Sequence, residues 1–146
     1  MRIPIIETKH CSMYYTESLL LFEQFWYEAS EFMTEEDFKQ LHLEWVQKLI
    51  KNKYNMYRFL LDNRDNLYQM SAKLQKWHDQ NIHQVVLQNL PDASKIKVAI
   101  VASEDFLTQL GIEQTFLENQ ELNSNVYYFT DVREARDWLM HQEFSL

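Results

Sequence analysis

The chain has 146 residues, of which 46% are hydrophobic and 14% aromatic, and its net charge is −8. This length suits one domain with a core of its own, and the negative charge disfavours nucleic acids and anionic membrane surfaces as partners. The single Cys11 excludes an intrachain disulfide framework. The longest apolar run, VAIVA at 98–102, is far shorter than the ~20 residues of a membrane span, and the start, MRIPIIETKH, lacks the apolar stretch of a signal peptide. We therefore expect a soluble cytoplasmic protein with no membrane span and no nucleic-acid partner.

The first half of the chain predicts a hairpin and then a helix. Residues 11–28 are rich in β-formers on both sides of the segment Thr16 to Ser18, which indicates two antiparallel strands. Thr34 is a typical N-cap, and acidic residues after it favour the positive end of a helix dipole. Apolar residues then recur at helical spacing to about Lys53. This predicted buried stripe comprises Phe38, Leu41, Trp45 and Leu49, with Val46 and Ile50 beside it.

The second half alternates strands and helices. Strands are predicted over 56–62, 96–102 and 126–129, the middle one apolar enough to be covered on both faces. A helix begins near Ser71 and a second is capped by Ser103, with a bend at Gly111. The first carries Leu74, Trp77, Ile82 and Val85, and the second carries Phe106, Leu110 and Leu117. A last helix covers 131–141, where Asp131 and Glu134 have the spacing of a capping box.

The predicted order of elements is therefore ββαβαβαβα. After the hairpin each strand is followed by a helix, which is typical of parallel strands joined by right-handed crossovers. We expect an α/β fold over residues 1–146 as a single domain. Its sheet is mixed, mostly parallel and made of about five strands, with helices covering it. The hairpin supplies an antiparallel strand at one edge.

Several segments, taken together, point to a known family. They are Trp26 at the end of the second strand, TEEDF (34–38), LLDNRD (60–65), SAKLQKW (71–77), KIKVAIVASEDF (95–106), IEQT (112–115) and YYFTDVREARDWL (127–139). Over nearly its whole length the chain thus resembles the bacterial SpoIIAA-like proteins of the STAS/SEC14 superfamily, and among them a branch common in Bacteroidetes-type bacteria. The resemblance implies a non-enzymatic regulatory or protein-interaction module. It also suggests an alternative, because SEC14-related members bind lipids or other apolar ligands under their helices.

The resemblance also draws attention to Ser71. In the anti-sigma-factor antagonists of this family, a phosphorylated serine within D-S-S-G opens the second helix. The matching position here lies in QMSAK, with no second serine and no glycine. This difference favours a structural N-cap over a phospho-acceptor at Ser71.

The carboxyl edge of the predicted sheet is the expected working surface, because α/β sheets bind ligands there. The loop and helix start at 62–73, with the helix start at 103–106 beside it, would offer N–H donors to an anion or to a partner's carboxylates. We expect Asp62 itself to bond to nearby backbone N–H groups or to Arg64. The candidate ligand or partner contacts are Asp62, Arg64, Asp65, Tyr68, Ser71, Lys73 and Ser103.

No catalytic, metal or cofactor site is predicted. The lone Gly111 excludes glycine-rich phosphate loops and the G-x-S-x-G elbow of serine hydrolases. His78 and His83 lie about 140° apart on an α-helix, so we expect them not to share a face as metal ligands do. Cys11 is expected to be a buried thiol. An enzyme that uses Asp62 or Asp65 as acid or base is a minor alternative, since no second group supports it.

Two functional hypotheses remain. The first is an interaction module with an unidentified protein partner, and a homodimer is expected if Trp26 and Tyr27 emerge at the end of the hairpin. The second is a binder of a small apolar ligand. It predicts a cavity between helices and sheet, lined by side chains such as Phe59, Leu74 and Trp77, where the first hypothesis predicts a filled core.

Overall fold

The computed structural model describes residues 1–117, 119 and 125–141, and its centre is one six-stranded sheet with the strand order β1-β2-β3-β4-β5-β6. Strand β2 is antiparallel to both of its neighbours, β1 and β3, and the strands from β3 to β6 are parallel. The expected α/β fold with a mixed sheet is thus confirmed. The strands are β1 (Arg2–Glu7), β2 (Cys11–Thr16), β3 (Leu21–Trp26), β4 (Arg58–Asp62), β5 (Lys97–Val101) and β6 (Val126–Phe129).

The first strand was not predicted, and about five strands was therefore too few. β1 pairs with β2 at the edge of the sheet, with a register shift between Pro4 and Ile6. Proline is tolerated at edge strands and bulges because it has no N–H to donate there. Lys48 of the first helix donates to the backbone oxygen of Ile5 over 2.7 Å and fixes β1 from below. The predicted hairpin, now β2 and β3, consequently lies inside the sheet and not at its edge.

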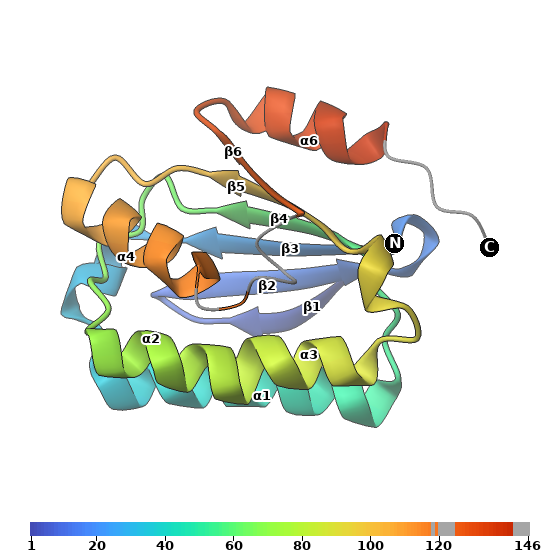
Figure 1. Cartoon of the computed structure of the whole chain (residues 1–146), viewed down its shortest axis with the longest axis horizontal. Helices are drawn as coiled ribbons and strands as arrows, with labels where there is room; N and C mark the ends of the chain where they lie inside the picture. Colours follow the sequence, from blue (N-terminus) through green and yellow to red (C-terminus); the bar gives the residue numbers. More distant parts are fainter. Residues whose placement is uncertain (118, 120–124, 142–146) are drawn as a thin grey trace.

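The helices divide unequally between the two faces of the sheet (Figure 1). Among the described helices, α1, α2, α3 and α4 cover one face and α6 covers the other. From β3 onward each crossover moves one strand further in the same direction, and right-handed crossovers then place their helices on the same face. The helices are α1 (Glu35–Asn52), α2 (Ala72–His78), α3 (Gln84–Asn89), α4 (Phe106–Leu117) and α6 (Val132–Met140), with a π turn (Asp79–His83) between α2 and α3 and short 3₁₀ turns at Glu17–Leu19, Glu28–Phe32 and Ala93–Lys95. Among the described residues, no helix is both long and apolar enough to span a membrane.

The two faces hold two separate apolar cores. The larger core, under α1 to α4, contains most of the buried aromatic side chains. The smaller one consists of sheet residues that α6 covers with Ala135 and Leu139. A buried carboxylate stands beside this smaller core: Glu23 is 3% exposed and accepts bonds from Arg2 at 3.1 Å and from Arg136 at 2.8 Å. These two ion pairs connect β1 and α6 to the central strand β3.

The helix caps agree with the sequence in three of four cases. Thr34 and Asp37 form a reciprocal capping box, Ser71 accepts from the backbone N–H of Leu74 at 3.1 Å, and Asp131 accepts from that of Arg133 at 2.7 Å. The fourth prediction, a cap at Ser103, was wrong. Asp105 caps α4 by accepting from the N–H of Thr108.

The predicted bend at Gly111 was also wrong, because α4 runs through this residue without interruption. Gly111 is buried where α4 crosses the start of α2. A Cβ atom built on it would meet Met70 and Gln75 at 3.7–3.8 Å, an ordinary contact distance. The glycine therefore lies at a helix contact and not at a hinge.

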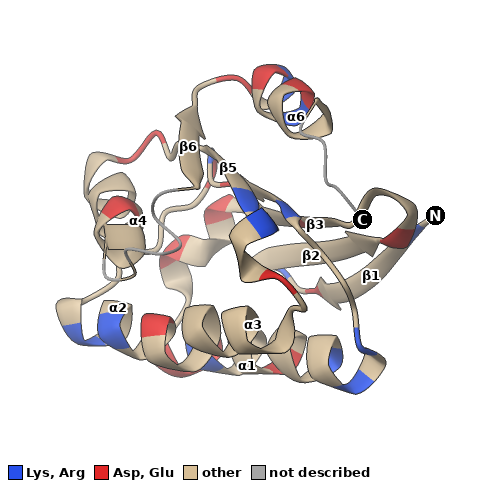
Figure 2. Ribbon diagram, turned by 45° about the vertical axis from the view of Figure 1, so that its right-hand side comes forward, with Lys and Arg blue, Asp and Glu red and all other residues tan. Residues whose placement is uncertain are grey.

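The apolar side chains that the sequence analysis named for α4 lie on its outer face. Phe106 is 76% exposed and Leu117 is 62% exposed, and Leu110 is exposed too. The side chains that point inward are Thr108, Ile112, Thr115 and Phe116. Figure 2 shows that the helix itself carries little charge. α1 differs from the prediction at two positions: Ile50 is exposed, and His42 lies in the buried stripe.

The cap at Ser71 can be tested by mutation. Ser71→Ala removes the acceptor for the Leu74 N–H and should lower the free energy of unfolding by about 1 kcal/mol. Ser71→Asp should retain stability, because a carboxylate also caps and favours the helix dipole. Urea unfolding provides the measurement, with Lys73→Ala in the same exposed turn as control, expected within about 0.5 kcal/mol of the unmodified chain. An unchanged stability of Ser71→Ala would contradict the assigned cap.

Candidate functional site

The loops that follow β4 and β5 lie side by side at the carboxyl edge of the sheet. The backbone N–H of Asn63 donates to the oxygen of Val101 at 2.9 Å, and the Ser103 hydroxyl donates to the oxygen of Asn66 at 2.7 Å. The two segments that were expected to adjoin one another do so. Ser103 is buried there and fixes the loops to each other.

Asp62 is bound by its neighbour in the chain, as expected. The Arg64 guanidinium donates to both carboxylate oxygens, Nε to Oδ1 at 3.0 Å and Nη2 to Oδ2 at 2.7 Å, and the Arg64 backbone N–H donates to Oδ1 as well. Asp62 is buried, and the bond raises the pKa of Arg64. Both oxygens of Asp62 are therefore engaged within the loop.

The other predicted residues have different surroundings. Asp65 and Lys73 are exposed, and Ser71 serves as the cap of α2. Tyr68 turns under the helices, where its ring stacks on Phe38 with centroids 5.2 Å apart. The predicted residues thus divide between loop fixation, the exposed surface and the wall of a pocket behind Tyr68.

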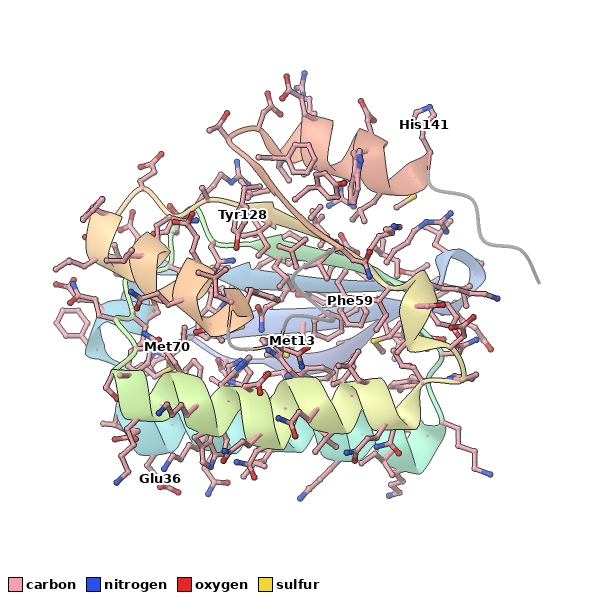
Figure 3. The ribbon with its side chains drawn as sticks, in the orientation of Figure 1. Met13, Glu36, Phe59, Met70, Tyr128 and His141 are labelled. Atoms are coloured by element: carbon pink, nitrogen blue, oxygen red, sulfur yellow. The ribbon has the colours of Figure 1, made fainter. Side chains whose placement is uncertain are left out.

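This pocket lies between the sheet and the helices on its covered face, is partly open, and has a volume of about 90 Å³. By the rule that one water needs roughly 10–15 Å³ of such space, it is large enough for several water molecules. Phe59 lines it, as predicted, and Figure 3 shows this side chain between the sheet and the helices, with Met70 at the start of α2. The prediction was wrong for Leu74 and Trp77, which are not part of the wall.

Ten of the 22 residues that line the pocket carry aromatic or imidazole rings. Trp26, Phe38 and Tyr68 form a stack with nearly parallel planes, at interplanar angles of 12° and 19°. The lining rings are Phe22, Trp26, Phe38, Trp45, Phe59, Tyr68 and Phe116, together with the imidazoles of His42, His78 and His83. The pocket therefore presents flat, polarizable surfaces on several sides.

The three imidazoles form a contact chain that was not predicted. His78 meets His83 edge-to-face at 4.5 Å and His42 at 4.8 Å, measured between ring centroids. The π turn explains the contact: the N–H of Gln84 donates to the oxygen of Asp79, five residues earlier. The predicted separation of His78 and His83 assumed the rotation of about 100° per residue of an α-helix. The wider π turn does not have this rotation, so the two side chains meet. π turns occur frequently at functional sites.

Two buried nitrogen atoms of the wall, Trp45 Nε1 and His78 Nδ1, have neither a hydrogen bond nor an ion-pair contact among the described residues, and a third, His83 Nδ1, has no hydrogen bond. Their neighbours are better satisfied. His42 Nδ1 must carry its proton, because it donates to the carbonyl oxygen of Phe38 at 2.8 Å, and His83 Nδ1 faces an Asp79 oxygen at 3.5 Å. An unpaired buried polar group costs about 1–3 kcal/mol, so both free nitrogen atoms call for an explanation.

Burial keeps two of the pocket histidines, His42 and His78, uncharged. Desolvation lowers the pKa of His42 to about 4. The pKa of His78 is well below its usual value, first through desolvation and then through repulsion from His83 and His42. Behind them, the bond with His83 lowers the pKa of Asp79.

Other reactive groups offer less. Cys11 is buried, as predicted, and burial raises its pKa well above the usual value. Within the described part of the chain, no group of three or more His, Cys, Asp and Glu side chains is placed to hold a metal ion. His141 is exposed and bonds within α6. The pocket combines aromatic rings, buried imidazoles and unpaired buried nitrogen atoms, and it is therefore the candidate site.

The buried histidines make stability depend on pH in a defined direction. His42 titrates near 6.5 when unfolded and near 4 when folded, so its contribution is complete above pH 6.5 and is lost as the pH falls toward 4. We expect His42 alone to lower the free energy of unfolding by about 1.4 kcal/mol per pH unit in this window, and His78 to steepen the fall. Urea unfolding between about pH 7 and about pH 5.5 measures how the free energy of unfolding changes with pH. This pH range lies above the titration of most carboxylates. His42→Phe should flatten it and the exposed His141→Gln should not; equal slopes for all three proteins would contradict the assignment.

Comparisons of the chain with protein-family models, with curated proteins and with solved structures find no match. Function is therefore inferred from the chemistry of the pocket and of the surface, since a fold alone does not imply a function.

Proposed function

We propose that the protein binds a small, mostly apolar molecule in the pocket between its sheet and helices. The pocket itself carries this proposal: it is partly open, about 90 Å³ in volume, and ten of its 22 lining residues carry rings. Left empty, such a space costs roughly 2 kcal/mol at the usual ~24 cal/mol per Å³. A ligand that fills it recovers this free energy and can also satisfy the two unpaired nitrogen atoms.

We further propose that the chain is a STAS/SEC14-type domain with a non-enzymatic role. Two features support this. The strands follow one another across the sheet with their crossover helices on one face, which agrees with the architecture that the family resemblance implies. Asp62, the residue considered as an acid or base, is occupied by Arg64 on both oxygens.

The binding proposal can be tested by filling the pocket. Val86 lines it, whereas the adjacent Val85 is half-buried outside the lining. We expect toluene or indole to shift the indole N–H signals of the four tryptophans saturably in two-dimensional NMR of the unmodified chain. Val86→Phe should abolish this response because the added ring occupies the space, and Val85→Phe should preserve it. A chain that shows no saturable response to either compound would refute the proposal.

A second function, a protein-interaction module, is favoured by the outer face of α4. Phe106, Leu107, Leu110 and Leu117 are all exposed there. Tyr128 of β6 is exposed beside them, and burial of its hydroxyl together with the charge of Glu113 on α4 raises its pKa to about 12. Contiguous exposed apolar side chains often mark a contact with another protein.

This surface differs from the one that the sequence suggested. Trp26 is buried in the pocket wall, where its Nε1 donates to Gln24 at 3.1 Å, and only Tyr27 is exposed. The condition set for a dimer contact at the end of the hairpin is therefore not met by Trp26, which lies in the pocket wall instead. If a homodimer forms, α4 offers a more extensive apolar surface for it.

The double variant Phe106→Ser with Leu110→Ser tests the α4 surface. Because both side chains are exposed, we expect a change in the free energy of unfolding of no more than about 0.5 kcal/mol for each. Light scattering over a range of concentrations should show association of the unmodified chain and a monomeric double variant. Gln114→Ser, an exposed polar position of the same helix, is the control and should associate like the unmodified chain. A monomeric unmodified chain at every concentration would exclude the homodimer.

A further inference from the structure

We infer that the ligand of this pocket is an uncharged, planar aromatic molecule that carries a hydrogen-bond acceptor, an inference that rests on the proposed binding function. Three properties of the wall lead to it: the orientation of the rings, the lack of charged side chains, and a buried donor without a partner.

The orientation of the rings favours a flat ligand. Trp26, Phe38 and Tyr68 lie with nearly parallel planes at centroid distances of 6.3 and 5.2 Å. The ring of His42 also lies against Phe38, with the ring centroids 4.2 Å apart and an angle of 36° between the planes. Aromatic molecules gain most from offset stacking and edge-to-face contacts with such surfaces. A planar ring therefore finds more complementary contacts here than a flexible alkyl chain does.

The charge balance of the wall favours a ligand without formal charge. Among the described residues that line the pocket, none is Asp, Glu, Lys or Arg, although these types make up 25% of the chain. His42 and His78 are neutral, and Asp79 behind them accepts a hydrogen bond from Gln84 Nε2 at 2.9 Å and faces His83 Nδ1 at 3.5 Å. A charged ligand would lose its hydration without meeting an opposite charge, which is strongly unfavourable.

The unpaired donor favours a ligand with an acceptor. Trp45 is 5% exposed, lines the pocket, and its Nε1 has no partner among the described residues. An indole N–H can only donate, so its natural complement is a carbonyl, ether or hydroxyl oxygen. His78 Nδ1 is unpaired too, but it donates or accepts according to its tautomer. The indole N–H of Trp45 is therefore the group that calls for a hydrogen-bond acceptor on the ligand.

The volume of the pocket limits the size of the ligand. At about 90 Å³ it is smaller than the ~150 Å³ cavity that holds benzene in another protein. A single ring must therefore reach the open side or displace a lining side chain. Met70 is suited to move, because it is half-buried and unbranched, and the contact of its sulfur with the Thr115 hydroxyl is weak at 3.7 Å.

Two nearly isosteric probes test the inference. Acetophenone is planar, uncharged and carries a carbonyl oxygen, whereas α-methylstyrene has a CH₂ group in place of that oxygen. Transfer from water to an apolar site favours the hydrocarbon, so a preference for the ketone requires a donor in the pocket. Titration followed by the indole N–H signal of Trp45, assigned by its loss in Trp45→Phe, should show roughly 3- to 10-fold tighter binding of acetophenone.

In Trp45→Phe, where binding is followed by the indole N–H signal of Trp26 in the same wall, this preference should disappear while α-methylstyrene still binds, which also shows that the variant retains its pocket. Benzoate, similar in size but charged, should bind more weakly than acetophenone. Equal or tighter binding of α-methylstyrene or of benzoate by the unmodified chain would overturn the inferred ligand class and leave the binding function intact. Absence of binding by all three probes and by toluene and indole would instead overturn the binding function itself.

Discussion

The one-way progression of the strands is the constraint on which the other features depend. Because each crossover from β3 onward adds the next strand on the same side, the right-handed rule sends their helices to one face. That face receives a thick layer of helices and the pocket. Of the described helices, α6 covers the opposite face, and the buried Glu23 with its two arginines fastens that helix to the middle of the sheet. The functional asymmetry of the molecule follows from its connectivity.

Within the helical layer, the π turn at Asp79–His83 decides which side chains reach the pocket. A regular α-helix would point His78 and His83 in directions about 140° apart. The wider turn instead brings them into contact with each other and brings His78 against His42. An apolar pocket thereby acquires polar atoms without acquiring charge. This combination allows it to discriminate between ligands by hydrogen bonding as well as by shape.

Local signals were sufficient to predict much of the fold. The hairpin, α1 with its cap at Thr34, and the last strand and helix follow from residue types and spacing. α4 shows where such signals fail: its apolar residues occur all round the helix, so spacing cannot tell which side is buried, and Thr108 and Thr115 proved to be inside. The pocket could be anticipated only in part, at Phe59, because cavities result from the packing of distant segments. Nothing in the sequence distinguishes a π turn from the α-helix on either side of it.

The strand order also bears on how the molecule assembles. Every strand pairs with the one that precedes it in the chain, so most partners are available as soon as they are synthesised. The face under α6 is the exception. Leu21, Leu60 and Ala99 belong to strands made early, yet their cover comes from residues 132–140, near the end of the chain. Until residues 132–140 have been synthesised and have folded onto the sheet, this apolar surface is exposed to water.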